Sequence, residues 1–438
     1  MTLLCGAAKA MINPPEGTLL AGYLAKRPAE GVHDPLFAKV LALKIQNKTL
    51  LMISLDLVSV DSRYVSELRN EIHDTFQIPI ESIMVHSTHT HSGPGGMTDE
   101  NSIVYKAFSG IWPPYVESIV KDHYEKIKNA VHEALSSLTP CTVRYGKGKA
   151  LGIAANRISI DRHFEPDLNV IIFERITGKQ IIVYHFACHP TIMHADNLLV
   201  SADFPGAANK YLEQNEEVEM SLFLNGPSGD VSTRFTRKDS SFDEVERMGR
   251  KLSECVLSTI KASTKLSVNH LDSNIVPITL GPRRFETEDQ LRGSLLKVQE
   301  EYKHGKEKGL TASELRRIES KIEGLTASIN LVNKLQNVAQ IKSEIQIVSI
   351  GDMYLATVPG EMFYETGWEI TNEFDEVCEV LLLGNTNDYI GYIVPEKFYE
   401  DNSYESSMTL LEKGSTEYIA SQIIKNVGGM KHVSNQRL

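Results

Sequence analysis

Two histidines, His89 and His91, lie two residues apart in the segment His89-Thr-His91-Ser-Gly-Pro-Gly-Gly96. In an extended backbone, side chains at this spacing point to the same side. Two imidazoles that converge beside a Gly- and Pro-rich loop, directly after a short apolar strand, suit a metal site or a catalytic site. The same spacing also occurs in hydrogen-bonded structural pairs, so the motif alone leaves both interpretations open.

A second histidine cluster follows a predicted strand, in the segment Phe186-Ala-Cys-His189-Pro-Thr, with His185 and His194 nearby. His189 stands where a buried strand ends, which is where α/β enzymes expose functional groups. Neutral imidazole is the commonest metal ligand, but a single histidine here is also compatible with a satisfied core residue. Asp203 is a candidate helix cap, a carboxylate that supports a ligand, or both.

Ser232 lies in the segment Asn225-Gly-Pro-Ser-Gly-Asp230-Val-Ser232, again directly after an apolar run. The glycines of this segment allow the backbone to approach a ligand closely. Ser232 is a candidate nucleophile, although the sequence shows no adjacent base to activate it. The alternative is a strand-to-helix turn in which Asp230 bonds its own backbone.

Two more polar segments follow later strands. Glu361 is predicted to begin a helix over 361–374, where the helix dipole favours a carboxylate even without a function. Tyr389 and Tyr392 lie in a loop rich in Asn and Gly after a predicted strand over 377–383, so either tyrosine could face a site. Each segment is ambiguous alone, but polar groups recur at the ends of apolar strands.

Alternating strands and helices must position these groups. Apolar runs predict strands, and a period of three to four predicts helices. The predicted strands cover 36–45, 49–57, 83–85, 168–173, 180–186, 220–224, 344–350 and 353–358, and the predicted helices cover 64–76, 114–138, 204–212 and 242–260. This alternation predicts an α/β fold built on a layered, mixed β-sheet.

Residues 287–337 break the alternation. Capping-box signatures at Thr287 and Thr311 each open an amphipathic segment, and an apolar seam with spacings of three and four begins at Leu315. The pattern predicts a helical hairpin, inserted into a single catalytic domain that spans 1–438. The hairpin is either a structural element packed on the body or an arm for dimerisation or for a partner, so a homo-oligomer stays open.

The composition excludes several classes of protein. The chain of 438 residues has 45 Lys and Arg against 57 Asp and Glu, a net charge of −12, which argues against a nucleic-acid or anionic-membrane partner. No apolar run approaches the roughly 18 residues of a transmembrane segment. Five scattered cysteines without a C-x-x-C motif are typical of a reduced, intracellular protein. The N-terminal residues lack the pattern of a secretory signal, so we expect a cytoplasmic location.

Taken together, the motifs resemble the catalytic domain of the neutral (alkaline, non-lysosomal) ceramidases. The resemblance rests on HTHSGPGG at 89–96, Asn156-Arg157, ACHPT at 187–191, GDVS at 229–232, VPGE at 358–361, and the Asn387, Tyr389 and Tyr392 loop. These motifs stand in the family's order and extend over most of the chain. The GDVS motif continues with Thr-Arg, where the family has Pro-Asn.

The resemblance implies a zinc ion held by two histidines, a glutamate and a tyrosine. Carried over motif by motif, these ligands become His89, His189, Glu361 and Tyr392. Such an ion lowers the pKa of a bound water to near neutrality and polarises an amide carbonyl.

The resemblance also implies roles around the metal. His91 would lie near the bound water or the substrate, and Arg157 would contact the scissile group and stabilise the developing oxyanion. Ser232 corresponds to the family's essential serine, either as a nucleophile or as a group that positions the attacking water. Gly95 and Tyr389, together with Arg157, are expected to contact the substrate.

The predicted function is therefore that of a zinc-dependent amidohydrolase that cleaves a linear N-acyl amide. Ceramide is one candidate substrate, and a smaller, more polar amide is another, because the chain is acidic and the expected location is cytoplasmic. The alternative is a catalytically inactive, metal-bearing binding or scaffold protein that uses 287–337 as its interaction arm.

Overall fold

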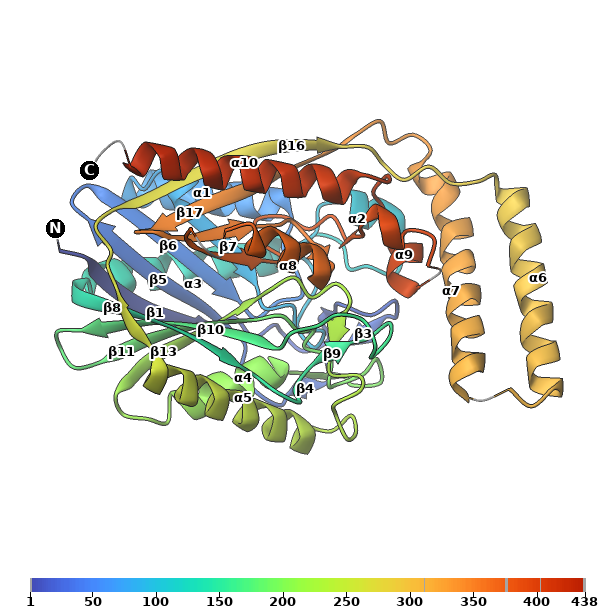
Figure 1. Ribbon diagram of the computed structural model, residues 1–438, viewed down its shortest axis with the longest axis horizontal. Coiled ribbons are helices and arrows are strands. Elements are labelled where there is room, and N and C mark those ends of the chain that lie inside the picture. Colours follow the sequence, from blue (N-terminus) through green and yellow to red (C-terminus); the bar gives the residue numbers. More distant parts are fainter. Residues whose placement is uncertain (1, 311, 375–376, 402, 436–438) are drawn as a thin grey trace.

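A computed structural model describes residues 2–310, 312–374, 377–401 and 403–435 (Figure 1). Within these residues the largest sheet has nine strands in the order β13-β11-β10-β8-β1-β5-β6-β7, with β15 pairing with β8. Its strands are β1 (Leu4–Met11), β5 (Phe37–Ile45), β6 (Lys48–Leu55), β7 (Ile83–Ser87), β8 (Thr139–Lys149), β10 (Asp167–Arg175), β11 (Gln180–Phe186), β13 (Val218–Asn225) and β15 (Thr264–Leu266). The pairs β6–β7 and β11–β13 are parallel, and the other pairs are antiparallel.

A second sheet of four described strands packs against the first. It consists of β16 (Leu271–Leu280), β17 (Ile341–Ile350), β18 (Met353–Thr357) and β20 (Glu379–Leu383). Both sheets contribute apolar side chains to one buried cluster, in which Leu41 and Met52 of the large sheet accompany Val348 and Leu355 of the small one. The two sheets therefore share a core.

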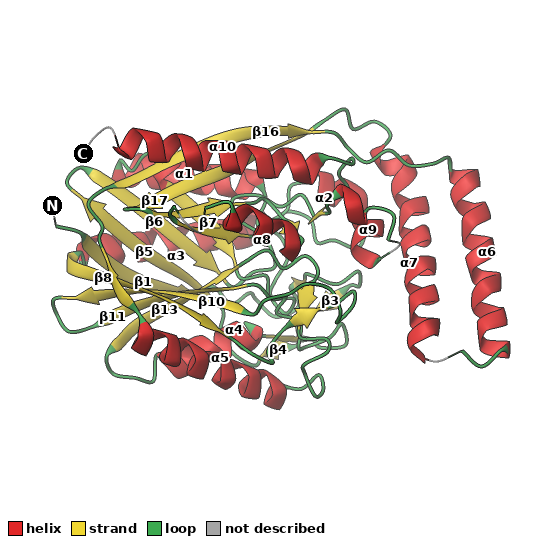
Figure 2. Ribbon diagram, viewed as in Figure 1, coloured by secondary structure: helices red, strands yellow, loops and turns green. Residues whose placement is uncertain are grey.

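Helices cover the two outer faces of this pair of sheets (Figure 2). On the large sheet lie α1 (Ser62–Phe76), α3 (Glu117–Ser136), α4 (Asp203–Leu212) and α5 (Phe242–Ala262). On the small sheet lie α8 (Tyr364–Asn372) and α10 (Ser415–Asn435). The result is a four-layer arrangement, which confirms the predicted α/β fold with a layered, mixed sheet.

Strand β5 shows why the sequence folds in this way. Successive side chains of a strand point to opposite faces, so Val40 and Ala42 pack under the helices while Leu41 and Leu43 pack against the second sheet. A strand buried on both faces needs an almost continuous apolar run. That requirement explains why β5 and the neighbouring β6 were recognisable from the sequence.

The predicted insertion is a helical hairpin. It consists of α6 (Glu288–Glu307), which opens with the expected Thr287 capping box, and α7 (Ala312–Leu335). The second predicted capping box, at Thr311, lies outside the described residues. Helix α7 also packs against α2 (Ile103–Phe108) and α9 (Tyr404–Met408), so the hairpin is attached to the body through its second helix (Figure 1).

The predicted helix over 361–374 is wrong at its start. Glu361 lies in the two-residue strand β19 (Glu361–Met362), and α8 begins only at Tyr364. The cause is tertiary, because β19 pairs in parallel with β21 (Tyr392–Ile393) from a distant loop. Helix α3 likewise begins at Glu117, three residues later than expected.

Strand β8 was not predicted, because its glycines and proline are typical of turns. In the structure Gly146 and Gly148 lie under α5, where an added Cβ would approach Thr259 to within 2.8 and 2.1 Å. These glycines therefore let the helix approach the sheet closely.

None of the described helices combines the length and the hydropathy that a transmembrane segment requires. That one domain spans the whole chain stays a prediction.

Candidate metal centre

Three buried histidines, His89, His91 and His189, converge where β7 and β11 end. Each ring offers one nitrogen, and these nitrogens lie within 4.8 Å of one another. The expectation of an extended backbone is wrong for His89, whose φ is 74°. The backbone bends there, and the Nε2 atoms of His89 and His91 still approach to 3.3 Å. Non-glycine residues in this left-handed conformation are often found at functional sites.

Backbone carbonyls fix the orientation of two of these rings. His89 Nδ1 lies 2.7 Å from the carbonyl oxygen of Val58, and His189 Nδ1 lies 2.6 Å from that of Ser228. A carbonyl only accepts hydrogen bonds, so in both rings Nδ1 carries a proton and donates it, which leaves Nε2 as the nitrogen that faces the cluster. Metal-ligating histidines usually show this arrangement.

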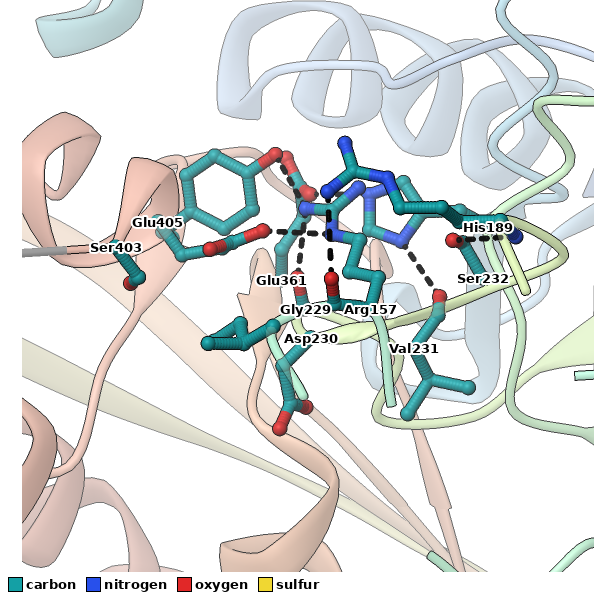
Figure 3. Close-up of polar contacts among 12 residues, drawn as sticks. Arg157, His189, Gly229, Asp230, Val231, Ser232, Glu361, Ser403 and Glu405 are labelled. Atoms are coloured by element: carbon teal, nitrogen blue, oxygen red, sulfur yellow. Dashed lines mark hydrogen bonds and ion pairs between the residues drawn. The ribbon is translucent and has the colours of Figure 1, made fainter. Parts of the chain in front are cut away.

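Glu361, in the strand β19, adds a carboxylate to the cluster from a distant part of the chain (Figure 3). Its Oε2 lies 2.8 Å from His189 Nε2 and 3.5 Å from His89 Nε2, and its Oε1 accepts a hydrogen bond from Tyr389. Burial would raise the pKa of Glu361, but His89 and His189 hold it well below its usual range. The carboxylate is therefore ionised.

The donor set fits a metal ion such as zinc. Burial, reinforced by Arg157, lowers the pKa of His189 to about 4, so its ring is neutral at physiological pH. His189 Nε2 and the ionised carboxylate of Glu361 lie 2.8 Å apart in a buried site, and an imidazole nitrogen and a carboxylate oxygen are both ligands that zinc takes.

Two very short strand pairs bring the remaining polar groups to the centre. Strand β14 (Val231–Ser232) pairs with β9 (Ala155–Asn156), which places Arg157 beside Ser232. The β19–β21 pair places Glu361 and Tyr392 opposite each other.

Arg157 is the most extensively bonded of these groups (Figure 3). Its Nε donates to Glu405 at 2.7 Å, and its Nη2 donates to the carbonyl of Gly229 at 2.8 Å and to the Tyr392 hydroxyl at 2.9 Å. Its orientation is therefore determined by three other parts of the chain.

Ser232 is buried, and its Oγ accepts the backbone N–H of Arg234 at 3.2 Å. Among the described residues, no histidine or carboxylate forms a hydrogen bond with this hydroxyl. The geometry therefore agrees with the sequence, which showed no adjacent base for Ser232.

A cavity of about 790 Å³ opens above this cluster. Of the residues singled out from the sequence, five line it: His91, Arg157, His194, Ser232 and Tyr392. The others lie beneath or beside it: His89, His189 and Glu361 form its buried floor, and Gly95 and Tyr389 are not among its lining residues. Gly95 packs so tightly that an added Cβ would lie 2.4 Å from Pro113.

The loop that follows His189 is held by Asp203. Its buried carboxylate accepts the backbone N–H groups of Ile192 and Met193, at 3.1 and 3.2 Å, and that of Phe204 at 2.7 Å. Burial raises the pKa of Asp203 to about 6. Asp203 thus supports the loop and the first turn of α4, and among the described residues it forms no hydrogen bond with a histidine of the cluster.

Sequence reasoning gave no role in the site to Tyr23, Arg237 or Glu405. Tyr23 packs edge-on against His91 with ring centroids 5.0 Å apart, and both Tyr23 and Arg237 line the cavity. No spacing in the sequence links these residues to the histidine motifs, because they reach the cavity only through the folding of distant loops.

Comparisons with known proteins identify the family of this chain. The family described as neutral/alkaline non-lysosomal ceramidase, N-terminal, matches residues 4–237, which is more than half of the chain. The neutral ceramidase of Mycobacterium tuberculosis is 22% identical, and the alignment covers 90% of this chain and 71% of that protein. The neutral ceramidase of Pseudomonas aeruginosa is 21% identical over 52% of this chain and 38% of that protein.

The fold is also similar to that of solved structures. The crystal structure of the P. aeruginosa neutral ceramidase superimposes with a TM-score of 0.79 at 18% identity, covering 99% of this chain and 75% of that one. A structure described as ceramidase complexed with C2 gives a TM-score of 0.76 at 18% identity, with 99% and 76% covered. Given the extent of the family match, this chain belongs to the neutral/alkaline non-lysosomal ceramidase family.

Proposed function

We propose that the chain is a zinc-dependent hydrolase that cleaves a linear N-acyl amide. The observation that carries the proposal is the buried convergence of imidazole nitrogens on the Glu361 carboxylate, with His189 Nε2 2.8 Å and His89 Nε2 3.5 Å from Glu361 Oε2, because these are ligand types that zinc takes. We assign the metal to His89, His189, Glu361 and Tyr392. A zinc ion held by these residues polarises the amide carbonyl and lowers the pKa of a water molecule.

Arg157 stabilises the charge that develops on the carbonyl oxygen. Its guanidinium lines the cavity and is already fixed by Glu405, Gly229 and Tyr392. A preorganised donor of this kind needs no reorganisation during the reaction, which is why such groups contribute strongly to catalysis.

His91 accepts the proton of the attacking water, and Ser232 positions that water. Of the three clustered rings, His91 alone is among the described residues that line the cavity. We assign to its imidazole the transfer of a proton from the water to the leaving amine. Ser232 has no base beside it, so it positions the water rather than attacking the amide.

The substrate must reach a cavity that the hairpin helps to form. Leu310 and Ile318 line it together with the catalytic groups, and α7 packs on α2 and α9. These contacts favour a hairpin that shapes the substrate site over a free scaffold arm. The relatives are named neutral ceramidases, so ceramide is one candidate substrate, and a smaller, more polar N-acyl amide is another. A cytoplasmic location stays part of this proposal.

Metal analysis and hydrolysis assays test the proposal together. We expect about one zinc per purified chain, hydrolysis of at least one member of a panel of N-acyl amides from ceramides to short polar amides, and loss of that activity with chelator. His189→Ala should lose most of the metal and the activity, whereas His132→Ala, which alters an exposed histidine on α3, should lose neither. Unchanged metal content in His189→Ala would refute the site, and turnover that survives complete chelation would refute the mechanism.

A further inference from the structure

The cavity carries more positive than negative side chains. Its charged lining consists of Arg157, Arg162, Arg234, Arg237 and Lys321 against Glu301, Asp401 and Glu405. Two of the carboxylates are paired with arginines, Glu405 with Arg157 at 2.7 Å and Asp401 with Arg162. Arg237 belongs to this excess of cations, because among the described residues no carboxylate forms an ion pair with it.

Arg237 makes two hydrogen bonds, both to uncharged acceptors. Its guanidinium donates to the carbonyl of Thr191 and to His194 Nε2, the latter at 2.5 Å. Among the described residues, no carboxylate contacts it. A guanidinium has five N–H donors and no acceptor, so Arg237 keeps donors for a ligand in the cavity.

The contact with Thr191 also fixes where this cation lies. Thr191 follows His189 by two residues in the loop that leaves the metal centre. Arg237 is therefore anchored to the segment that carries a proposed metal ligand, and it is held close to the place where an amide would be cleaved.

The neighbours of Arg237 do not neutralise it. Burial lowers the pKa of His194, and Arg237 and Arg234 lower it further, although Asp196 acts in the opposite direction. His194 is therefore an uncharged acceptor for Arg237. Arg234 adds a second positive charge nearby, and its Nη1 donates to the carbonyl of Arg157 at 3.3 Å.

An apolar part of the lining accompanies these cations. Ile158, Leu310 and Ile318 belong to the same cavity. A cavity that combines apolar side chains with clustered arginines suits a ligand that has a hydrocarbon chain and an anionic group.

We propose that Arg237, assisted by Arg234, forms an anion-binding subsite that selects N-acyl amides whose amine-derived half carries a carboxylate, that is, N-acylated amino acids. This inference rests on the proposed hydrolase function and names its substrate class. The acyl chain lies along the apolar lining, and the carboxylate pairs with the guanidinium of Arg237. One water is consumed: the C–N bond breaks, the acyl carbon gains the hydroxyl group, and the amine nitrogen gains the proton, giving a fatty acid and an amino acid.

Two matched compounds test the subsite. N-dodecanoylglycine carries the carboxylate, and N-dodecanoylglycinamide has the same shape without the charge. Their affinities are measured by calorimetry on the chelator-treated protein, and their kcat/KM values are measured on the zinc-loaded protein. We expect the acid to be favoured about 10- to 100-fold in both measurements, because a charge-assisted hydrogen bond is lost with the amide.

Substitutions assign that preference to Arg237. Arg237→Gln should weaken binding and turnover of the acid about 10-fold or more and change the glycinamide by less than about 2-fold, and Arg237→Lys should recover part of the preference. Arg234→Gln, on an exposed side chain, should give a smaller loss in the same direction. Lys238→Gln neutralises an exposed residue outside the cavity lining and should change nothing. Thermal unfolding shows that each variant is folded.

The two measurements separate the two proposals. Equal affinity of the protein without substitutions for both compounds, or an equal effect of Arg237→Gln on the binding of both, overturns the subsite. A preference in binding that Arg237→Gln abolishes supports the subsite even if no amide is hydrolysed, and in that case the hydrolase function fails alone.

Discussion

The floor and the mouth of the cavity are built in different ways. At the floor, the side chains of His89, His189 and Glu361 are at most 3% exposed, and backbone carbonyls or a tyrosine hydroxyl hold each of them in place. The mouth is formed by the loop with Arg234, which is exposed, and by the hairpin α6–α7, which joins the body through α7.

The difference indicates that the floor and the mouth have separate functions. A metal site needs fixed distances, which the ends of buried strands provide. Substrate choice requires only that the lining match the ligand, and loops and insertions change without disturbing a core. We therefore expect substitutions at the floor to affect metal binding and rate, and substitutions at the mouth to affect substrate preference.

Substitution of Ser232 should give the largest effect, and it should lower the rate of hydrolysis without changing metal binding. Ser232→Ala removes the hydroxyl that positions the attacking water, so kcat/KM should fall about 100- to 1,000-fold while the zinc content stays unchanged. Steady-state kinetics and metal analysis on the same sample measure both. Ser228→Ala is the matched control, because the Ser228 hydroxyl is buried without a partner among the described residues and its carbonyl to His189 is kept. An active Ser232→Ala enzyme would remove this serine from the mechanism.

Tyr389→Phe should weaken metal binding at the floor without removing a metal ligand. The variant deletes the hydrogen bond to Glu361 Oε1, and loss of such a supporting bond typically lowers metal affinity about 10- to 100-fold. Competition with a chelator of known affinity measures the change, and excess zinc should restore the activity. If zinc affinity does not change, Tyr389 has no part in orienting the carboxylate.

Ile318→Ala should give the smallest effect, and only at the mouth. It trims an apolar lining residue on α7, so KM for a dodecanoyl amide should rise about 5- to 10-fold with kcat unchanged, while an acetyl amide is unaffected. Leu296→Ala, on the exposed face of α6 and 63% exposed, serves as the control. A fall in kcat with both substrates would show that the hairpin affects the chemical step. That result would contradict the expectation that substitutions at the mouth affect substrate preference.

Much of the fold follows from local pattern. Strands β5, β6, β10, β11 and β13 and helices α1, α4 and α5 were located within a few residues, because their apolar faces are long and periodic. Strands β1 and β8 in the middle of the large sheet were not predicted; the glycines of β8 are typical of turns, although they serve close packing with α5. Helix α10 was missed as well, and its apolar residues Ile419, Ile423 and Val427 pack on the second sheet.

The sequence by itself determined the class of fold, the family resemblance and a short set of residues with metal-ligand chemistry, because these depend on residue type, order and local period. Only the tertiary structure decided which of those residues meet. The pairs β9–β14 and β19–β21 are two residues long, too short to leave a local pattern, yet they place Arg157 beside Ser232 and Glu361 opposite Tyr392. The proton positions of His89 and His189 and the role of Arg237 likewise depend on carbonyls from distant segments, which exist as partners only after the chain has folded.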